Sequence, residues 1–200
     1  KDDGSVVTWG DSGLGGNSSG VADQLSSGVD KIFSTTHAFA ALKEDGSVVT
    51  WGSSERGGDS SGVTDQLSSG VDQIFSAASV FAALKKDGSV VTWGNQLTGG
   101  DSSGVADQLS SGVDTIFSAN SAFAALKDDG SVVTWGYSDR GANSSGVAGQ
   151  LSSGVDKITP SWMAFAALKD DGSVVTWGKS DQGGDSSGVA DKLSSGVDQI

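Results

Sequence analysis

One stretch of the chain, Phe39-Ala-Ala-Leu-Lys-Glu-Asp-Gly-Ser-Val-Val-Thr-Trp-Gly52, decides the fold. It contains two short apolar segments, residues 39–42 and 48–51, on either side of Asp45-Gly46. Asp-Gly between two apolar runs is a strong β-hairpin signal, because glycine readily adopts the positive φ that such turns need. The stretch therefore predicts a β-hairpin as the building block of the protein.

The same hairpin pattern recurs through the whole chain at a constant spacing. It returns at residues 81–94, 123–136 and 165–178, and its second half alone opens the chain at residues 1–10. A period of 42 residues separates the equivalent lysines Lys1, Lys43, Lys85, Lys127 and Lys169. We therefore interpret the chain as a single repeat domain, 1–200. Its repeats are 1–42, 43–84, 85–126, 127–168 and 169–200, the last of which is incomplete.

A period in the forties is typical of propeller blades and of helical repeats. Each repeat is interrupted by several glycines, and glycine costs about 1 kcal/mol in a helix interior, so helical repeats are disfavoured. β-branched and aromatic residues predict strands in the second repeat at residues 47–51, 71–75 and 79–84. Residues 63–67 fit either one helical turn, capped by Ser60 or Ser61, or an extended edge.

The apolar residues of the predicted strands are nearly continuous rather than alternating, as at Val48-Val49 and residues 81–84. Strands that are covered on both faces have this pattern, and each blade of a propeller lies between two others. We expect the small pair Ala82-Ala83 on the crowded inner strand near the axis. Large aromatic side chains are expected to fill the space between blades, and the candidates are Trp9, Trp51, Trp93, Trp135 and Trp177.

The order of these segments resembles a known repeat. The run Val-x-x-Gln-Leu-x-x-Gly-Val-x-x-Ile, followed by Phe-Ala-Ala-Leu-x-x-Asp-Gly-x-Val-x-x-Trp-Gly, is similar to the regulator-of-chromosome-condensation type of β-propeller repeat. The resemblance covers the entire chain, and the repeats here are a short, 42-residue variant. It implies a propeller fold. It also implies an exchange-factor activity, for which the residues themselves offer no separate support.

The predicted fold is thus all-β: a β-propeller built from 42-residue tandem repeats, with five blades if the ring closes. The alternatives are an open propeller segment and a β-solenoid. The chain has five Val-Val-Thr-Trp segments and four Phe-Ala-Ala-Leu segments, so a closed ring has one blade short of a strand. An open array leaves blade edges that favour self-association. Because the chain begins and ends inside repeats, we expect an excerpt of a longer protein or a trimmed one.

Composition excludes several partners. The chain has 12 basic and 25 acidic residues and a net charge of −13, which disfavours nucleic acid and anionic membranes. No cysteine is present, so disulfides and cysteine-based metal sites are excluded. The apolar runs are too short for membrane insertion. An acidic, cysteine-free, glycine- and serine-rich array is typical of secreted or bacterial cell-surface proteins. Engineered repeat proteins, which would be cytoplasmic, share this composition.

Two places differ between the repeats: the loop after each Trp-Gly and the loop before each Phe-Ala-Ala-Leu. Variable loops on a rigid scaffold often carry recognition, although loops also drift when nothing constrains them. Candidate interaction residues in the first loop are Glu55, Arg56, Tyr137, Arg140 and Asp181, and in the second loop His37, Asn120, Trp162 and Met163. Trp162 and Met163 fit either an exposed contact or inward packing that compensates for Thr159-Pro160 in place of Phe-Ser. We favour packing.

Catalytic and metal sites are not predicted. His37 is the only histidine, and the adjacent Asp2 and Asp3 are interpreted as turn residues. Calcium needs about six to eight oxygen ligands, and the Gly-Gly-Asp-Ser-Ser runs recur only once in 42 residues, so we expect no cofactor, with bound calcium as the alternative. The function predicted is a non-catalytic interaction or adhesion module that binds protein or glycan. The alternative is a purely structural or designed scaffold without ligand.

Overall fold

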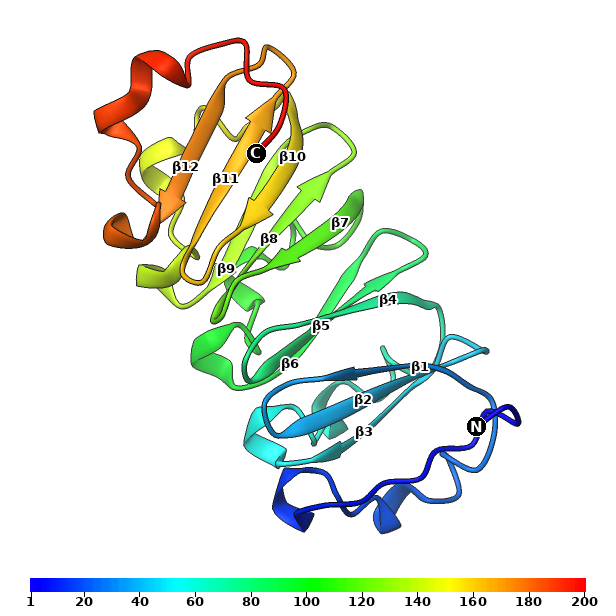
Figure 1. The fold of residues 1–200 in the computed structure, drawn as a ribbon. Coiled ribbons are helices and arrows are strands. Elements are labelled where there is room, and N and C mark those ends of the chain that lie inside the picture. The colour runs from blue at the N-terminus through cyan, green and yellow to red at the C-terminus, as the bar shows by residue number, and fades with distance from the viewer. The chain divides into compact units, whose positions relative to one another are not determined.

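The computed structural model describes residues 1–200, and the chain divides into two compact units, Lys1–Asp101 (unit 1) and Ser102–Ile200 (unit 2). Each unit contains two antiparallel three-stranded sheets whose strands lie side by side in chain order (Figure 1). The sheets of unit 1 are β1-β2-β3 and β4-β5-β6, and those of unit 2 are β7-β8-β9 and β10-β11-β12. The interpretation as one repeat domain stays a prediction.

The twelve strands repeat three segments of sequence. In unit 1 they are β1 (Val29–Ser34), β2 (Ala38–Lys43), β3 (Val48–Gly52), β4 (Val71–Ser76), β5 (Val80–Lys85) and β6 (Val90–Gly94). In unit 2 they are β7 (Val113–Ser118), β8 (Ala122–Lys127), β9 (Val132–Gly136), β10 (Val155–Pro160), β11 (Ala164–Lys169) and β12 (Val174–Gly178). The fold is therefore mostly β, with four repeated sheets. The number of blades and the closure of a ring stay predictions.

Short 3-10 helices occupy the loops between sheets. Those of unit 1 are η1 (Ser12–Leu14), η2 (Ser19–Val21), η3 (Ser54–Arg56), η4 (Ser61–Val63) and η5 (Gln96–Thr98). Those of unit 2 are η6 (Ser103–Val105), η7 (Ser138–Arg140), η8 (Ser145–Val147), η9 (Ser180–Gln182) and η10 (Ser187–Lys192). None of these helices has the length and apolar character needed to cross a membrane.

The predicted hairpin is confirmed. Phe39 lies opposite Trp51 in the pairing of β2 with β3, and the Lys43 N–H donates to the Ser47 carbonyl across the turn at 2.9 Å. Gly46 has a φ of +78°, the left-handed conformation that the Asp-Gly signal indicates. The Asp45 carboxylate accepts hydrogen bonds from the Ser47 N–H and hydroxyl, which fixes the turn.

The Phe-Ala-Ala-Leu strand is the middle strand of each sheet, so the expected place on an inner strand is wrong. Its middle position explains the sequence, because Ala82 and Ala83 are fully buried between neighbours on both sides and both faces. A nearly continuous apolar pattern shows that both faces are covered, but it does not distinguish an inner strand from a middle one.

Residues 63–67, for which the sequence fits either one helical turn or an extended edge, form a helical turn. The Leu67 N–H donates to the Val63 carbonyl at 3.1 Å, and Leu67 is 2% exposed. The expected serine cap is wrong: Ser60 makes no capping bond, and the Asp59 carboxylate accepts from the Ser61 N–H at 2.9 Å instead. The Ser60 hydroxyl lies 2.9 Å from the Thr50 hydroxyl, which ties the loop to strand β3.

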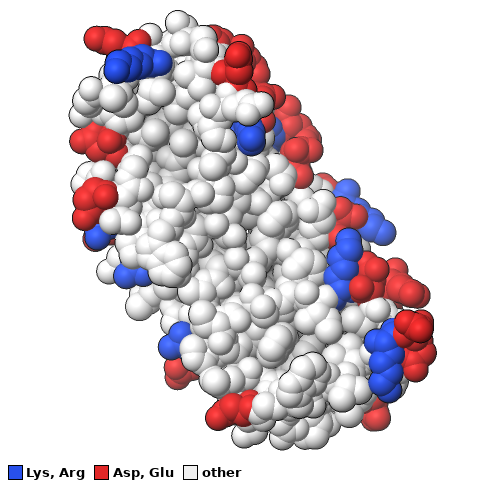
Figure 2. Space-filling view, viewed as in Figure 1, with Lys and Arg blue, Asp and Glu red and all other residues white.

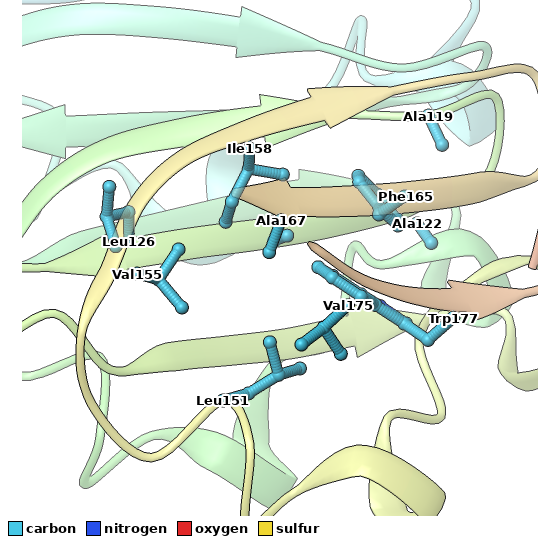
Figure 3. Close-up of a cluster of buried hydrophobic side chains, with 11 residues drawn as sticks. Ala119, Ala122, Leu126, Leu151, Val155, Ile158, Phe165, Ala167, Val175 and Trp177 are labelled. Carbon is cyan, nitrogen blue, oxygen red and sulfur yellow. The ribbon is translucent and has the colours of Figure 1, made fainter. Parts of the chain in front are cut away.

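Apolar side chains from neighbouring sheets form the cores. In unit 2, Phe165, Val175 and Trp177 pack with Leu151, Val155 and Ile158 and with side chains of β8 (Figure 3). Unit 1 has the equivalent cluster around Phe81 and Trp93. Each of the four phenylalanine–tryptophan pairs is stacked with ring centroids 5.2 to 5.4 Å apart. The expectation that these tryptophans fill buried space is confirmed for Trp51, Trp93, Trp135 and Trp177, which are 3% to 5% exposed.

In three of these four aromatic pairs, those of Trp51, Trp93 and Trp177, a glycine of the preceding loop contacts both rings. Gly57 has a φ of +99°, and a Cβ there would lie 2.6 Å from the Phe81 ring. The Gly57 carbonyl accepts a hydrogen bond from the Trp93 Nε1–H at 3.1 Å. The same contact joins Trp51 to Gly15 and Trp177 to Gly141, at 3.0 Å each.

The first Val-Val-Thr-Trp segment, residues 6–9, is not a strand, which corrects the expectation of five equivalent strands. Val7 is 59% exposed and Trp9 is 84% exposed, so the expectation that Trp9 fills a core is also wrong. The physical reason is that this segment has no Phe-Ala-Ala-Leu strand beside it.

Candidate functional site

The two variable loops of the repeats lie at the same end of each sheet. Because Ala38 at the start of β2 pairs with Gly52 at the end of β3, the loop before β2 meets the loop after β3. The Ser53 N–H donates to the His37 carbonyl at 2.9 Å, and the Thr35 hydroxyl donates to the Arg56 carbonyl at 3.0 Å. Equivalent bonds join Asn95 to Ser79, Tyr137 to Ser121 and Lys179 to Met163.

We call this surface the loop face, and we describe it separately for each unit. In unit 1 it consists of residues 35–37, 53–56, 77–79 and 95–98. In unit 2 it consists of residues 119–121, 137–140, 161–163 and 179–182. Hydrogen bonds also connect the loops of successive sheets, because the Thr36 N–H and hydroxyl donate to the Ala78 carbonyl at 3.1 and 2.7 Å. Similarly, the Asn120 N–H donates to the Trp162 carbonyl at 3.1 Å.

The loop face of unit 1 is polar around His37 and Arg56. His37 is half-buried, and its Nδ1 lies 2.6 Å from the Thr36 hydroxyl. Arg56 is exposed and donates from Nη1 to the Ser79 hydroxyl at 3.3 Å. Glu55 forms no ion pair with Arg56. These side chains are held by neutral hydroxyl groups. The large apolar side chain that this loop face exposes is Leu97, which is 75% exposed.

The loop face of unit 2 carries an arginine held against an aromatic ring. The Arg140 Cζ lies 5.3 Å from the centroid of the Tyr137 ring, and Nη1 donates to the Ser121 hydroxyl at 3.2 Å. A cation–π contact of this exposed kind contributes about 0.5–1 kcal/mol. Asn120 also donates to the Ser121 hydroxyl, at 3.2 Å. Tyr137 remains 42% exposed, so its ring is available to a partner.

Trp162 is 63% exposed, so the favoured interpretation of inward packing is wrong for this residue. Its carbonyl is fixed by the Asn120 N–H, while its side chain extends to solvent. Thr159, which replaces the phenylalanine of other repeats, is half-buried in β10 and donates to the Ile200 carbonyl at 3.2 Å. The lost phenylalanine is thus not replaced by Trp162. Met163 is half-buried.

The predicted residue Asp181 is paired with a neighbour. Its carboxylate lies 3.5 Å from the Lys179 ammonium group, and both side chains are largely exposed. The Ser161 hydroxyl donates to the Gln182 carbonyl at 3.2 Å and joins the two loops. Sequence reasoning missed the serines that hold the arginines, Ser79 and Ser121, which are 9% and 3% exposed. The sequence does contain a signal for these two serines, because Ser79 and Ser121 occupy the same repeat position as His37, in the variable loop before the middle strand.

The structure brings no group of three histidines, acidic residues or cysteines together for a metal ion. Asp45, Asp87, Asp129 and Asp171 instead accept hydrogen bonds from a serine two residues later, and these bonds lower the pKa of each carboxyl group. Grooves of about 630 and 580 Å³ in unit 2 are lined by equivalent residues of two repeats, such as Lys169 of β11 and Thr176 of β12 in the first groove and Lys127 and Thr134 in the second. Figure 2 shows acidic and basic side chains near one another toward the margins of the visible face.

No known family profile matches the chain, and no curated protein sequence matches it either. Solved structures do match in fold. Yeast RCC1 (Prp20), in a complex with Kap60, has a TM-score of 0.52 and 17% identity, and the match covers 77% of this chain and 44% of that one. The CRINKLY WD40 ectodomain of the Arabidopsis thaliana receptor kinase ACR4 has a TM-score of 0.49 and 16% identity, covering 75% and 52%.

A computationally designed protein, Ika8, also matches, with a TM-score of 0.40 and 15% identity over 77% of this chain and 46% of that one. The chain spans about half the length of the solved structures that it matches here. The predicted resemblance is therefore confirmed at the level of fold: the chain is structurally similar to RCC1-type β-propeller domains, and its four three-stranded sheets resemble their blades.

Proposed function

We propose that the chain is a non-catalytic protein-binding module that contacts its partner through the loop face of unit 2. The observation that carries the proposal is the exposure of two aromatic side chains, Trp162 at 63% and Tyr137 at 42%, on loops that hydrogen bonds tie together. Tryptophan, tyrosine and arginine dominate the binding energy of protein interfaces. All three occur within this one loop face.

The free energy gained by burying the exposed part of Trp162 is large enough to support recognition of a partner. A tryptophan side chain buries roughly 150–250 Å², so covering the exposed part of Trp162 removes on the order of 100 Å² from water, which contributes about 2–4 kcal/mol. The contacts of Arg140 with Tyr137 and Ser121 hold the guanidinium group before binding. Side chains that are already ordered lose less conformational entropy when a partner binds.

A protein partner is favoured over a glycan by the half-buried Met163 next to Trp162. Methionine is a flexible apolar contact that is common on protein-binding surfaces. The exposed pair of Lys179 and Asp181 adds charges of both signs at the rim, where they contribute to specificity more than to affinity. The second candidate, a structural scaffold without ligand, rests on the near-identity of the strands.

The test is a selection of peptides from a displayed random library against the chain, followed by affinity measurements on variants. Trp162→Asn and Tyr137→Asn introduce the residues found at the same positions of other repeats, Asn120 and Asn95, so the scaffold accommodates them. We expect the selected peptides to lose about tenfold or more in affinity, equivalent to about 1.4 kcal/mol.

The matched control is the same change in unit 1, Ala78→Asn with Ser53→Asn, which should leave the affinity unchanged. A glycan array is screened in parallel. Glycan binding that depends on Trp162, without peptide binding, would redirect the proposal to a glycan. Absence of any binder, or binders that ignore both aromatic substitutions, would favour the structural scaffold.

A further inference from the structure

Two asparagines occupy the same position of the repeat. They are Asn17 in unit 1, between η1 and η2, and Asn143 in unit 2, between η7 and η8. Both are exposed. The other three repeats have an aspartate at this position: Asp59, Asp101 and Asp185. Two serines follow in every repeat, so the chain contains Asn-Ser-Ser at this position twice.

The fold needs an acceptor oxygen at this position rather than an amide. The Ser145 N–H donates to Oδ1 of Asn143 at 3.1 Å, and in the equivalent turn the Ser61 N–H donates to the Asp59 carboxylate at 2.9 Å. A side-chain oxygen that accepts from the backbone two residues later forms an Asx turn, for which asparagine and aspartate are both suited. The amide nitrogen of Asn143 therefore adds nothing to the turn.

This amide nitrogen is presented to solvent by an ordered backbone. Because the Ser145 N–H needs an acceptor, Oδ1 of Asn143 faces the backbone, and Nδ2 is the atom left without a protein partner. The Asn143 N–H donates to the Ser138 carbonyl at 3.3 Å, and the Ser144 hydroxyl lies 3.0 Å from the Thr134 hydroxyl of β9. The loop thus holds a nucleophilic-group precursor, a primary amide, in a fixed and accessible place.

The surroundings of Asn143 suit a polar group attached to Nδ2. Asn143 lines the groove of about 580 Å³ in unit 2, together with Lys127, Asp129 and Ser131. These side chains carry hydrogen-bond donors and acceptors that match the hydroxyl groups of a sugar. A sugar ring attached to Nδ2 therefore has both space and polar partners beside it.

We propose that Asn17 and Asn143 are acceptor sites for N-linked glycans. Asn-x-Ser, with any residue except proline at x, is the acceptor sequence for this modification. The substrate is an oligosaccharide carried on a lipid pyrophosphate, and the catalyst is an oligosaccharyltransferase. Nδ2 forms a bond to C1 of the first sugar and loses one proton, while the bond from C1 to the pyrophosphate breaks and the lipid pyrophosphate leaves with the electron pair.

The residue two positions after the asparagine selects these two sites. Asn95 and Asn120 are followed there by leucine and alanine, so they lack the hydroxyl group of the acceptor sequence. Each unit thus has one acceptor. The modification takes place in a secretory compartment, in agreement with the secreted or cell-surface location that the composition predicts.

The test directs the chain into the secretory pathway of a eukaryotic cell and measures its intact mass before and after treatment with peptide N-glycosidase. We expect two glycans, one on each asparagine. Asn143→Asp and Ser145→Ala should each remove one of the two. Aspartate is the residue of three other repeats at this position, and Ser145→Ala keeps the N–H of the turn, so both variants retain the fold.

A gain of modification is the matched experiment in an unmodified repeat. Asp59→Asn completes Asn-Ser-Ser at residues 59–61 and should add a third glycan, whereas Asp59→Asn combined with Ser61→Ala should add none. None of these variants changes Trp162 or Tyr137, so the proposed function is tested separately. A mass equal to that of the unmodified chain, or a second glycan that persists in Ser145→Ala, would overturn the proposal.

The stability of the folded chain gives a second readout. Because Nδ2 takes part in no contact, the glycosylated chain should unfold at a urea concentration no lower than that of the chain treated with the glycosidase. A lower urea midpoint with the glycans attached would show that the folded loop does not accommodate the sugar, and it would also overturn the proposal.

Discussion

Replacing Gly57 with alanine should destabilise unit 1, because two separate costs meet at this residue. Gly57 has a φ of +99°, and the added Cβ would lie 2.6 Å from Cδ2 of Phe81, a ring that is fully buried against Trp93. The left-handed conformation costs alanine roughly 1–2 kcal/mol. Overpacking in a closed core costs roughly 1–3 kcal/mol more. The expected loss of stability is therefore about 2–5 kcal/mol.

The chain supplies two controls that separate these costs. Gly183 has the same φ of +99° but no atom within 4 Å of the position of its Cβ, so Gly183→Ala carries only the backbone cost of about 1–2 kcal/mol. Gly62 has neither a positive φ nor a neighbour within 4 Å. Gly62→Ala should be neutral or stabilise by about 0.4–1 kcal/mol.

The assay is urea unfolding followed by tryptophan fluorescence, with hydrogen exchange to locate the effect. Exchange should accelerate in β4, β5 and β6 for Gly57→Ala and in no strand of unit 1 for Gly183→Ala. If Gly57→Ala costs no more than Gly183→Ala, contact of the added Cβ with the Phe81 ring contributes nothing to the loss of stability, which would contradict this prediction.

Three hydrogen-bonded side chains can be tested by single substitutions. Trp93→Phe removes the hydrogen bond from Nε1 to the Gly57 carbonyl. The free energy of unfolding in urea should fall by about 1–3 kcal/mol, because the buried carbonyl loses its partner. An unchanged urea midpoint would contradict this. Thr36→Val removes the hydroxyl bond to the Ala78 carbonyl at 2.7 Å and the contact with His37 Nδ1, and it should cost about 0.5–1.5 kcal/mol. Thr64→Val removes only the longer bonds to the Ser60 and Ser61 carbonyls, at 3.3 and 3.2 Å, and should cost less; an equal cost would contradict this. Hydrogen bonds from the Ser89 hydroxyl and N–H lower the pKa of Asp87 from its ordinary value of 3.8. The contribution of Asp87 to stability is therefore present above about pH 4 and is lost as the pH falls through the lower folded-state pKa. Ser89→Ala should flatten this part of the curve of stability against pH, and a curve of unchanged shape would count against the prediction.

The repeat and the hairpin were predictable from sequence because they depend on local signals. Asp45-Gly46 indicated the turn, and the β-branched residues on its C-terminal side indicated a strand. The order of strands was not predictable in the same way. The fully buried pair Ala82-Ala83 suits an inner strand as well as a middle one, and only the pairing with both neighbours distinguishes them.

A comparison of the repeats identifies the two variable loops, but it identifies neither their arrangement nor the serines that hold the arginines, Ser79 and Ser121. Differences between repeats identified both loops, yet their meeting at one end of the sheet depends on the register that pairs Ala38 with Gly52. The sequence carries no signal for the orientation of the Trp162 side chain, because the change to Thr159-Pro160 fits both inward packing and exposure. The structure leaves Trp162 63% exposed, so the expectation of packing was wrong.

The most direct test of the proposed recognition surface is hydrogen exchange of the chain with and without a selected peptide bound. We expect slower exchange at residues 119–121, 137–140 and 161–163 of unit 2, with unit 1 unchanged. Protection confined to unit 1 or to the strand edges, with these three loops exchanging as in the free chain, would contradict it.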